Sequence, residues 1–196
     1  MSQTLIGRRV LLRPLVVGDF SKWADVRTES HDWLRVWEPL PVADPDPASD
    51  KSAFALRCAA RDRDWLAGVG YGFGVFVGDE FAGEININSV QRGPFQSCQV
   101  GYWISEKHAG KGYVPEGLVL VIDYVFSKLK LHRAEVAIVP RNVASLRVVE
   151  KLGLRNEGTA RRFLEINGVW EDHVRFAVTE EDWAVMAKGL FEAWID

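Results

Sequence analysis

The sequence has no apolar run that approaches the length of about 20 residues needed to span a bilayer. Its beginning, Met-Ser-Gln-Thr-Leu-Ile-Gly-Arg-Arg, contains no apolar stretch of the kind found in secretory signals. No internal repeat with a period of about 20 to 50 residues is visible either. These absences argue against membrane, exported and repeat proteins, and we expect a cytoplasmic protein with no membrane contact.

Cysteine and net positive charge are also scarce. Cys58 and Cys98 are far apart and form no CxxC motif, so we expect buried free thiols rather than a disulfide. The chain has 24 basic and 27 acidic residues, a net charge of −3 and no basic patch, which argues against nucleic-acid binding. The four histidines lack the spacing of metal ligands, and no metal is expected.

What is present fits one globular domain over residues 1–196. Of these residues 47% are hydrophobic and 26% charged, which allows a sizeable core. Alternating strand and helix patterns run along the whole chain. We therefore predict a mixed α/β (α+β) fold, in which helices flank a central, twisted and mostly antiparallel sheet.

The pattern also places the individual elements. Strands are predicted at 9–16, 71–77, 81–90, 97–104, 132–139, 161–166 and 169–178. Helices are predicted at 18–29, 31–37, about 50–65, 115–129, 142–152 and 179–194. Asp19 is the expected N-cap of the first helix, and either Ser49 or Asp50 that of the third. Residues 39–50 are rich in proline and aspartate and are predicted to form a loop.

A short loop with two glycines, Gly110 and Gly112, is the most informative segment. It follows the strand at 97–104 and leads directly into the helix at 115–129. Free N–H groups and the positive dipole end of a helix N-terminus suit a phosphate, and glycines allow a ligand close to the backbone. Positive charge is added by Lys107, His108 and Lys111.

The loop matches neither of two common phosphate-binding motifs. No Gly-Lys-Ser/Thr follows as in a P-loop, and Pro115 stands where GxGxxG has its third glycine. Pro115 fits the first turn of a helix, but it has no N–H to donate to a phosphate. From the residues alone, an anion site and an ordinary turn stay equal alternatives.

Residues 100–113 resemble motif A of the GNAT N-acetyltransferases. A strand ending Gly-Tyr-Trp-Ile precedes x-x-Gly-x-Gly-Tyr and a helix, with Lys107 where that family usually has Gln or Arg. The resemblance continues at 132–135 (His-Arg-Ala-Glu), 140–145 (Pro-Arg-Asn-Val-Ala-Ser) and 150–154 (Glu-Lys-Leu-Gly-Leu). Residues 33–39 and 157–173 resemble the RimJ/RimL branch, which acetylates the N-termini of ribosomal proteins.

The resemblance implies acetyl-coenzyme A as co-substrate, bound mainly by backbone groups. Its pyrophosphate would lie on the loop of Lys107, His108, Ala109, Gly110, Lys111, Gly112 and Tyr113. Its pantetheine arm would pair with the strand backbone at Trp103 and Ile104, and an N–H near Ile104 would meet the acetyl oxygen. Asn142 would contact the coenzyme, although it is also a good N-cap, and both roles are compatible. The side chains of Tyr102 and Trp103 are interpreted as core aromatics.

The resemblance also implies a general acid. RimL-like enzymes have a serine near the coenzyme sulfur, where it protonates the departing thiolate, and Ser145 matches that serine. Many other acetyltransferases use a tyrosine one helical turn later, where this chain has Val149. A serine in the first turn of a helix is otherwise ordinary. We predict that Ser145 is the general acid.

A general base is needed because a protein α-amine has a pKa of about 8 and must lose a proton before it attacks. Alternation in the strand at 81–90 places Glu84, Asn86 and Asn88 on one face. A polar face on a central strand is typical of a cleft. We predict Glu84 as the base and Asn86 as an acceptor-binding residue.

Three alternatives to Glu84 stay open. Glu135 lies between apolar residues in a strand, where pairing with Arg133 or His132 explains it equally well. Glu165 lies next to Leu164, which occupies the position of a glutamate in RimL-like enzymes. Water is the third alternative, because positioning of the reactants alone can accelerate a reaction strongly.

The acceptor is expected to lie among the segment at 31–37, the strand of Glu84 and the hairpin at 161–170. Trp33 and Trp37 are four residues apart on one helical face and either wall this cleft or anchor the short helix.

Other polar residues are given structural interpretations. Asp172 and His173 are strand neighbours that point to opposite faces, so they are structural or acceptor-edge residues rather than an acid–base pair. His31 and His108 are expected on the surface.

We therefore expect direct transfer of an acetyl group from acetyl-coenzyme A to the N-terminal amine of a protein, a ribosomal protein by resemblance. One alternative is the same chemistry on a small amine, such as a polyamine, an amino acid or an aminoglycoside. Another is a non-catalytic module that binds coenzyme A and regulates a partner. A strongly acidic cleft would favour a polycation, and a groove open at both ends a peptide. The sequence leaves a homodimer open.

Overall fold

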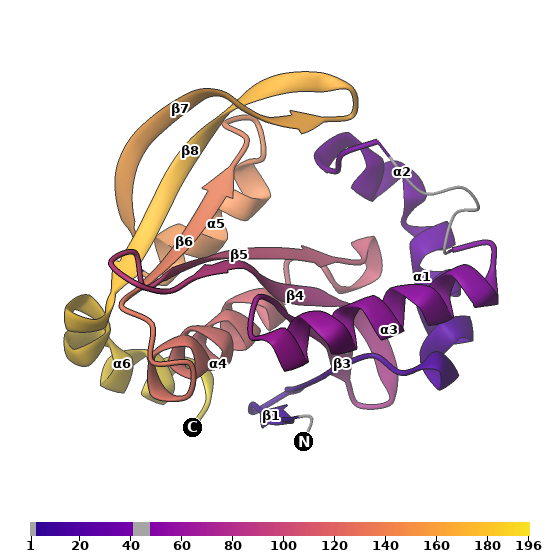
Figure 1. Ribbon diagram of the computed structural model, residues 1–196, viewed down its shortest axis with the longest axis horizontal. Helices are drawn as coiled ribbons and strands as arrows, with labels where there is room; N and C mark the ends of the chain where they lie inside the picture. The colour runs from indigo at the N-terminus through magenta and orange to yellow at the C-terminus, as the bar shows by residue number, and fades with distance from the viewer. Residues whose placement is uncertain (1–2, 41–47) are drawn as a thin grey trace.

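The computed structural model describes residues 3–40 and 48–196 (Figure 1). One sheet has the strand order β1-β2-β3-β4-β5-β6-β8-β7. Its strands are β1 (Leu5–Ile6), β2 (Val10–Arg13), β3 (Tyr71–Val77), β4 (Glu80–Gln91), β5 (Ser97–Ile104), β6 (Arg133–Ile138), β7 (Arg155–Ile166) and β8 (Val169–Thr179). The α-helices are α1 (Phe20–Glu29), α2 (His31–Leu34), α3 (Lys51–Ala67), α4 (Tyr113–Ser127), α5 (Val143–Lys151) and α6 (Glu180–Trp194). Three short 3-10 helices are η1 (Val17–Asp19), η2 (Arg35–Trp37) and η3 (Glu106–His108).

The sheet opens between β5 and β6, the pair of strands that runs parallel. Their pairing extends only from Ser97 opposite Arg133 to Gln99 opposite Glu135. The β4–β5 pairing continues to Ile104 at the end of β5. From residue 100 onwards, β5 therefore pairs with β4 on one side and not with β6 on the other. Figure 1 shows β6, β7 and β8 diverging from the β3–β5 part of the sheet.

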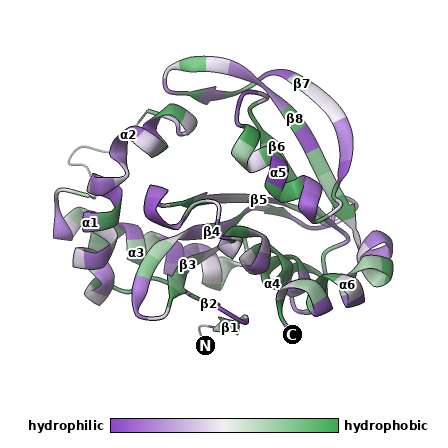
Figure 2. Ribbon diagram, turned by 180° about the vertical axis from the view of Figure 1, so that it is seen from behind, coloured by the Kyte–Doolittle hydropathy of each residue, from purple (hydrophilic) through white to green (hydrophobic). Residues whose placement is uncertain are grey.

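Helices cover the two faces of the sheet differently. Helix α4 is buried from Val114 to Phe126 apart from Asp123, and Gly117 brings its backbone close to Ile85 on β4. Figure 2 shows α4 as a largely hydrophobic helix. The opposite face of β4 lies under α1 and α3, where Trp23 and Phe54 form a second, smaller cluster. This burial accounts for the strong apolar pattern that predicted α4 from the sequence.

The predicted mixed α/β fold with a mostly antiparallel sheet is confirmed, and β3 and β5 have the predicted bounds. β1 was not predicted, because two residues carry no pattern, and β7 begins at Arg155, six residues before the predicted start. Asp50 caps α3 by accepting from the N–H of Ser52 at 2.6 Å. The predicted loop residues Pro41, Asp44, Pro45, Asp46 and Pro47 lie outside the described residues.

The prediction for Asp19 is right about position and wrong about the cap itself. Asp19 precedes α1, but its carboxylate makes no hydrogen bond to that helix. It accepts instead from the N–H of Val16 at 2.9 Å and from both terminal nitrogens of Arg13 at 2.7 Å. A bidentate guanidinium is a stronger partner than a single helical N–H.

Candidate functional site

The end of β5 that lies beyond the β6 pairing is held by β4 on one edge and by α2 on the other. Gly83 of β4 lies opposite Ile104, and a Cβ at Gly83 would stand 2.2 Å from the carbonyl oxygen of Trp103. From α2, the Trp33 indole Nε1 donates to the carbonyl oxygen of Ile104 at 3.1 Å. Of the two alternatives for Trp33, these contacts support an anchor between the short helix and the end of β5. Apart from the carbonyl of Ile104, the edge of β5 that faces away from β4 is left for another partner.

The glycine loop follows β5 and ends at α4. Gly110 and Gly112 both have left-handed backbones, with φ of +74° and +85°, and Gly112 is the N-cap of α4. A Cβ at Gly110 would meet nothing within 4 Å, so open space lies beside the loop. The backbone N–H of Glu116 donates to the carbonyl oxygen of Gly112 at 3.3 Å and closes the first turn of α4. The backbone N–H groups that precede Glu116 in the helix have no intrahelical partner. This arrangement suits an anion.

The side chain of His108 was predicted at the surface, and this is wrong. His108 is only 6% exposed, with Nδ1 2.8 Å from the Ser105 hydroxyl and Nε2 3.3 Å from a Glu80 carboxylate oxygen. Burial lowers the pKa of His108, so the ring is neutral and adds no charge to the loop. The 3-10 turn that directs this ring inward has no signal in the sequence. His31 is exposed, as predicted.

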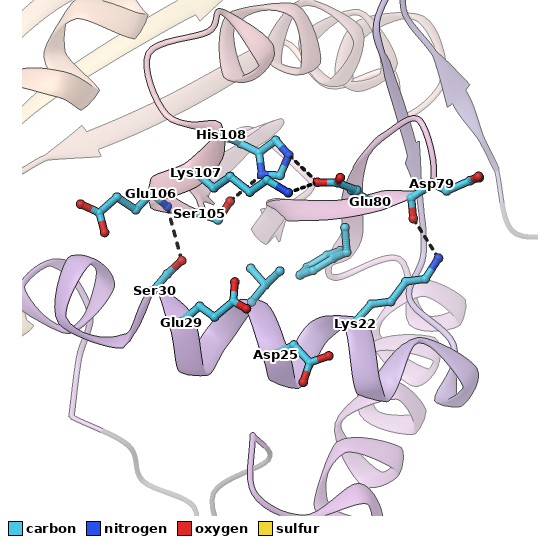
Figure 3. Close-up of a pocket in the computed structure, with 12 residues that line it drawn as sticks. Lys22, Asp25, Glu29, Ser30, Asp79, Glu80, Ser105, Glu106, Lys107 and His108 are labelled. Carbon is cyan, nitrogen blue, oxygen red and sulfur yellow. Dashed lines mark hydrogen bonds and ion pairs between the residues drawn. The ribbon is translucent and has the colours of Figure 1, made fainter.

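A cavity of about 620 Å³ lies beside the loop, between α1, the β3–β4 turn and η3 (Figure 3). Its lining carries five carboxylates, from Asp25, Glu29, Asp79, Glu80 and Glu106, against the ammonium groups of Lys22 and Lys107. Lys107 is itself paired with Glu80 at 2.5 Å. The cavity was not predicted, and its negative lining suits a cation better than a phosphate.

Two hydroxyl groups join α5 to the open part of β5. Asn142 caps α5 by accepting from the N–H of Ser145 at 3.1 Å, so the N-cap interpretation is confirmed. The Ser145 hydroxyl donates to the Tyr102 hydroxyl at 2.8 Å, which in turn donates to the carbonyl oxygen of Ser145 at 3.2 Å. Burial raises the pKa of Tyr102 and keeps it protonated. Sequence reasoning treated Tyr102 as a core aromatic and missed this contact.

Glu84 is buried on the face of β4 that lies under α1 and α3. Its carboxylate accepts from Trp23 Nε1 at 2.7 Å, from Arg57 at 2.6 Å and from the Asn86 amide at 3.4 Å. Burial raises the pKa of Glu84, but the charge of Arg57 and the two stronger hydrogen bonds outweigh it, so the pKa lies below its usual value. Glu84 is therefore ionised at neutral pH.

The polar face of β4 does not line an open cleft, contrary to the prediction. Helix α3 covers it: Arg57 donates to the Glu84 carboxylate at 2.6 Å, and Arg61 donates to the Asn88 amide oxygen at 3.2 Å. Between them lies a cavity of about 20 Å³, enough for one water molecule. Among the described residues, the amide oxygen of Asn86 is buried without a hydrogen-bond partner beside this cavity.

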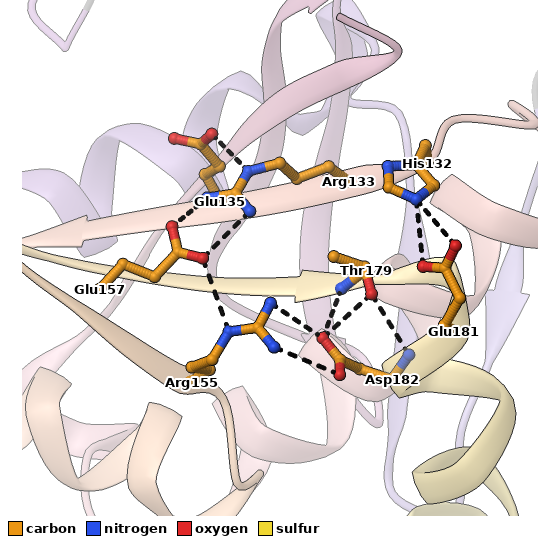
Figure 4. A network of polar contacts seen from close by, with 8 residues as sticks. All are labelled: His132, Arg133, Glu135, Arg155, Glu157, Thr179, Glu181 and Asp182. Atoms are coloured by element: carbon orange, nitrogen blue, oxygen red, sulfur yellow. Dashed lines mark hydrogen bonds and ion pairs between the residues drawn. The ribbon is translucent and has the colours of Figure 1, made fainter.

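Glu135 belongs to an ionic network on β6 and its neighbours (Figure 4). Its carboxylate pairs with Arg133 at 2.7 Å and with Arg175, which confirms the pairing alternative with Arg133. Burial raises the pKa of Glu135, but the two arginines outweigh burial, so the pKa lies below its usual value. His132 pairs with Glu181 instead. Glu135 therefore has partners that account for it without catalysis.

The β7–β8 hairpin reaches back to the segment that contains Trp37, as Figure 1 shows. At its tip the N–H of Asn167 donates to the carbonyl oxygen of Glu38 at 2.8 Å. Arg141 lies 4.6 Å from the centre of the Trp37 ring, donates to Val36 and pairs with Glu171 on β8. The two outer segments predicted on the acceptor side are thus in contact.

Asp172 and His173 have structural contacts inside this hairpin. The Asp172 carboxylate accepts from the N–H of Arg162 at 2.8 Å. His173 is buried, with Nδ1 donating to the carbonyl oxygen of Glu171 at 3.0 Å and its ring against Phe163. These contacts support the structural interpretation. Glu165 is half-buried opposite Trp170 in the same hairpin.

The cysteines are buried and free, as predicted. Burial raises the pKa of Cys98 to about 12 and that of Cys58 above its usual value, so both thiols are protonated at neutral pH. Within residues 3–40 and 48–196, no three His, Cys, Asp or Glu side chains gather to hold a metal ion. No helix in these ranges is long and apolar enough to cross a membrane.

Known proteins resemble most of the chain. The acetyltransferase (GNAT) domain family matches residues 9–155. The chain is 34% identical over 181 residues to the probable N-acetyltransferase YjcK of Bacillus subtilis, which covers 91% of this chain and 98% of that protein. It is 33% identical over 177 residues to the [ribosomal protein uS5]-alanine N-acetyltransferase of Escherichia coli, which covers 89% and 90%.

Solved structures agree. Mycobacterium smegmatis RimJ, in complex with CoA-disulfide, has a TM-score of 0.88 at 28% identity and covers 98% of this chain and 93% of that one. The ribosomal-protein-S5-alanine acetyltransferase of Vibrio fischeri has a TM-score of 0.83 at 26% identity, with coverage of 92% and 98%.

Proposed function

Because the chain belongs to the GNAT acetyltransferase family, we propose that it transfers the acetyl group of acetyl-coenzyme A to the N-terminal α-amine of a ribosomal protein. One observation carries the coenzyme part: the unpaired edge of β5 leads directly into the glycine loop and the N-terminus of α4. The acceptor part is supported by the E. coli relative, a ribosomal-protein-alanine N-acetyltransferase.

The residues present fit acetyl-coenzyme A. Open space beside Gly110 and the N–H groups at the start of α4 suit its pyrophosphate, along the loop from Lys107 to Tyr113. At the open edge of β5 the N–H of Ile104 is offered to an extended amide chain such as pantetheine, whereas the carbonyl of Trp103 faces β4 and that of Ile104 accepts from Trp33. When bound, the coenzyme supplies an activated acetyl thioester, and Asn142 stands at the adjoining end of α5.

Ser145 is the proposed general acid. Its hydroxyl lies at the first turn of α5, 2.8 Å from the hydroxyl of Tyr102 on β5. A thiolate leaving along the open edge of β5 would be protonated by Ser145. Ser145 would regain a proton from solvent, while Tyr102, which stays protonated, turns its hydroxyl from the carbonyl to donate a hydrogen bond to the serine oxygen. A backbone N–H near Ile104 would hold the negative charge on the acetyl oxygen.

Glu84 is the proposed base, acting through one water. Its lowered pKa keeps it ionised at neutral pH, and the cavity of about 20 Å³ beside Glu84 and Asn86 has room for that water. The orphaned amide oxygen of Asn86 would accept a hydrogen bond from the water. Because Trp33 is anchored at the end of β5 and Trp37 contacts Arg141 below the hairpin tip, both would border the acceptor.

A polyamine acceptor is a second candidate, favoured by the five carboxylates that line the large cavity beside η3. Thiol release from acetyl-coenzyme A, measured with a panel of amines, separates the two. Coenzyme A thiol should be released in the presence of peptides with free Ala, Ser, Thr or Met N-termini. It should not be released in the presence of the same peptides with blocked N-termini. Release with spermidine or an aminoglycoside alone would replace the peptide proposal, and binding of coenzyme A without any release would replace enzymatic transfer.

A further inference from the structure

A fully buried carboxylate stands directly behind the glycine loop. Glu116, in the first turn of α4, has an exposed fraction of 0%. Its Oε1 accepts from the backbone N–H groups of Arg9 at 2.5 Å and Val10 at 3.0 Å, and its Oε2 accepts from Arg9 Nε at 2.8 Å. One buried carboxylate therefore fixes both the backbone and the guanidinium of Arg9.

The other nitrogens of Arg9 reach the loop itself. Nη1 donates to the carbonyl oxygen of Lys111 at 3.0 Å, and Nη2 donates to the carbonyl oxygen of Gly112 at 3.4 Å. The guanidinium carbon lies 5.2 Å from the centre of the Tyr113 ring. A Cβ at Gly112 would stand 3.2 Å from Nη2 and from the Trp194 ring, so a side chain there would crowd this contact, and the φ of +85° disfavours one as well.

These two carbonyl contacts determine where the loop N–H groups point. In a planar trans peptide, the C=O of one residue and the N–H of the next are directed oppositely. Because the carbonyls of Lys111 and Gly112 point toward Arg9, the N–H groups of Gly112 and Tyr113 point away from it. Two left-handed glycines would otherwise leave this backbone many alternative conformations.

We propose that Arg9, held by Glu116, is a positioning residue that fixes the glycine loop with its N–H groups directed at the pyrophosphate of acetyl-coenzyme A. This rests on the proposed function. The positive charge of Arg9 is neutralised by Glu116 at 2.8 Å, so its contribution is the direction of the backbone rather than attraction of the anion. Lysine has the charge of arginine without its planar fork and cannot replace it.

The test uses two thioesters that differ in the nucleotide part. Acetyl-coenzyme A contains the pyrophosphate with its phosphorylated adenosine, and S-acetylpantetheine contains neither. Arg9→Met and Arg9→Lys should each raise KM for acetyl-coenzyme A, and the Kd of coenzyme A in calorimetry, by about tenfold. The kinetics with S-acetylpantetheine should stay within about twofold of wild type, which shows that folding and catalysis are intact. Arg8→Met is the matched control, because Arg8 is exposed like Arg9 but makes none of its contacts with Glu116 and the loop, and it should behave like wild type with both thioesters.

Each other result overturns the proposal. If the Arg9 variants lose as much with S-acetylpantetheine as with acetyl-coenzyme A, Arg9 supports the fold rather than the loop. If Arg9→Lys keeps wild-type affinity, charge and not orientation matters. Glu116→Gln, which removes the charged partner of Arg9 Nε, should reproduce the selective loss. If wild type itself binds no coenzyme A, the proposed function falls first, and that result is distinct from all of these.

Discussion

At the scale of single residues, the hydroxyl pair of Ser145 and Tyr102 connects the structure to the chemistry. Ser145→Ala and Tyr102→Phe should each lower kcat about 100-fold, the scale of lost general acid catalysis, with little change in KM. If the two hydroxyls act together, the double variant should be no slower than the slower single variant. Additive losses in steady-state kinetics would show that Tyr102 acts separately.

Glu84 gives a second prediction at this scale. If it removes the proton from the amine, Glu84→Gln should lower kcat about 100-fold at pH 7, with coenzyme affinity unchanged. Asn88→Asp is a useful control, because it adds a carboxylate on the same face without touching Glu84. A kcat for Glu84→Gln within twofold of wild type would assign the proton to bulk water.

The same variant makes a prediction about stability. The lowered pKa of Glu84 contributes stability that is complete above its unfolded pKa of about 4.3. That stability is lost as the pH falls through the lower folded pKa. Glu84→Gln should therefore reduce the free energy of unfolding at pH 7 by about 3 kcal/mol, because Arg57 loses its buried partner. The deficit should shrink in acid, and denaturant titrations at pH 7 and pH 3 with equal deficits would contradict this assignment.

At the scale of elements, most helices and strands were predictable because their own side chains encode them. β3 is rich in aromatic and β-branched residues, β5 alternates over its first half, and the apolar stripe of α4 identifies that helix. Strand pairing was less accessible. β6 pairs with β5 only as far as Gln99, and this separation depends on long-range packing. No local pattern in residues 97–104 predicts it.

Candidate site residues were predictable to the extent that they depend on the backbone. The glycine loop and the Asn142 cap were found because their residue types reveal their conformations. Two residues were missed because their partners are distant in the sequence. Arg9 contacts Glu116, about a hundred residues away, and Tyr102 contacts Ser145, about forty residues away. The polar face of β4 was misinterpreted for the same reason: its arginine partners lie on α3.

The contact between β4 and β5 yields a prediction for the open edge. Gly83→Ala should destabilise the fold by about 2 kcal/mol, because its Cβ would stand 2.2 Å from the carbonyl oxygen of Trp103. Gly101→Ala is the matched control in the neighbouring strand, where a Cβ meets only the Asn88 amide at 3.9 Å. Thermal unfolding should separate the two variants, and equal melting temperatures would contradict the close approach.

At the scale of the whole molecule, the β7–β8 hairpin and the segment around Trp37 close over the proposed acceptor side. Arg141 joins them through Glu171, Val36 and Trp37. Arg141→Ala should raise the KM of a peptide acceptor about tenfold and leave the Kd of coenzyme A unchanged. Arg147→Ala, an exposed change on α5, should alter neither quantity. A loss of coenzyme affinity in Arg141→Ala would place this arginine on the coenzyme side instead.

The most direct measurement of the proposed transfer is a fragment mass spectrum of a peptide after incubation with the enzyme and acetyl-coenzyme A. The peptide should have a free N-terminal alanine and an internal lysine. We expect one acetyl group on the α-amine, none on the lysine, and a strongly reduced yield with Ser145→Ala. An unmodified peptide beside an acetylated polyamine, or acetyl groups on lysine alone, would contradict the proposal of an N-terminal acetyltransferase.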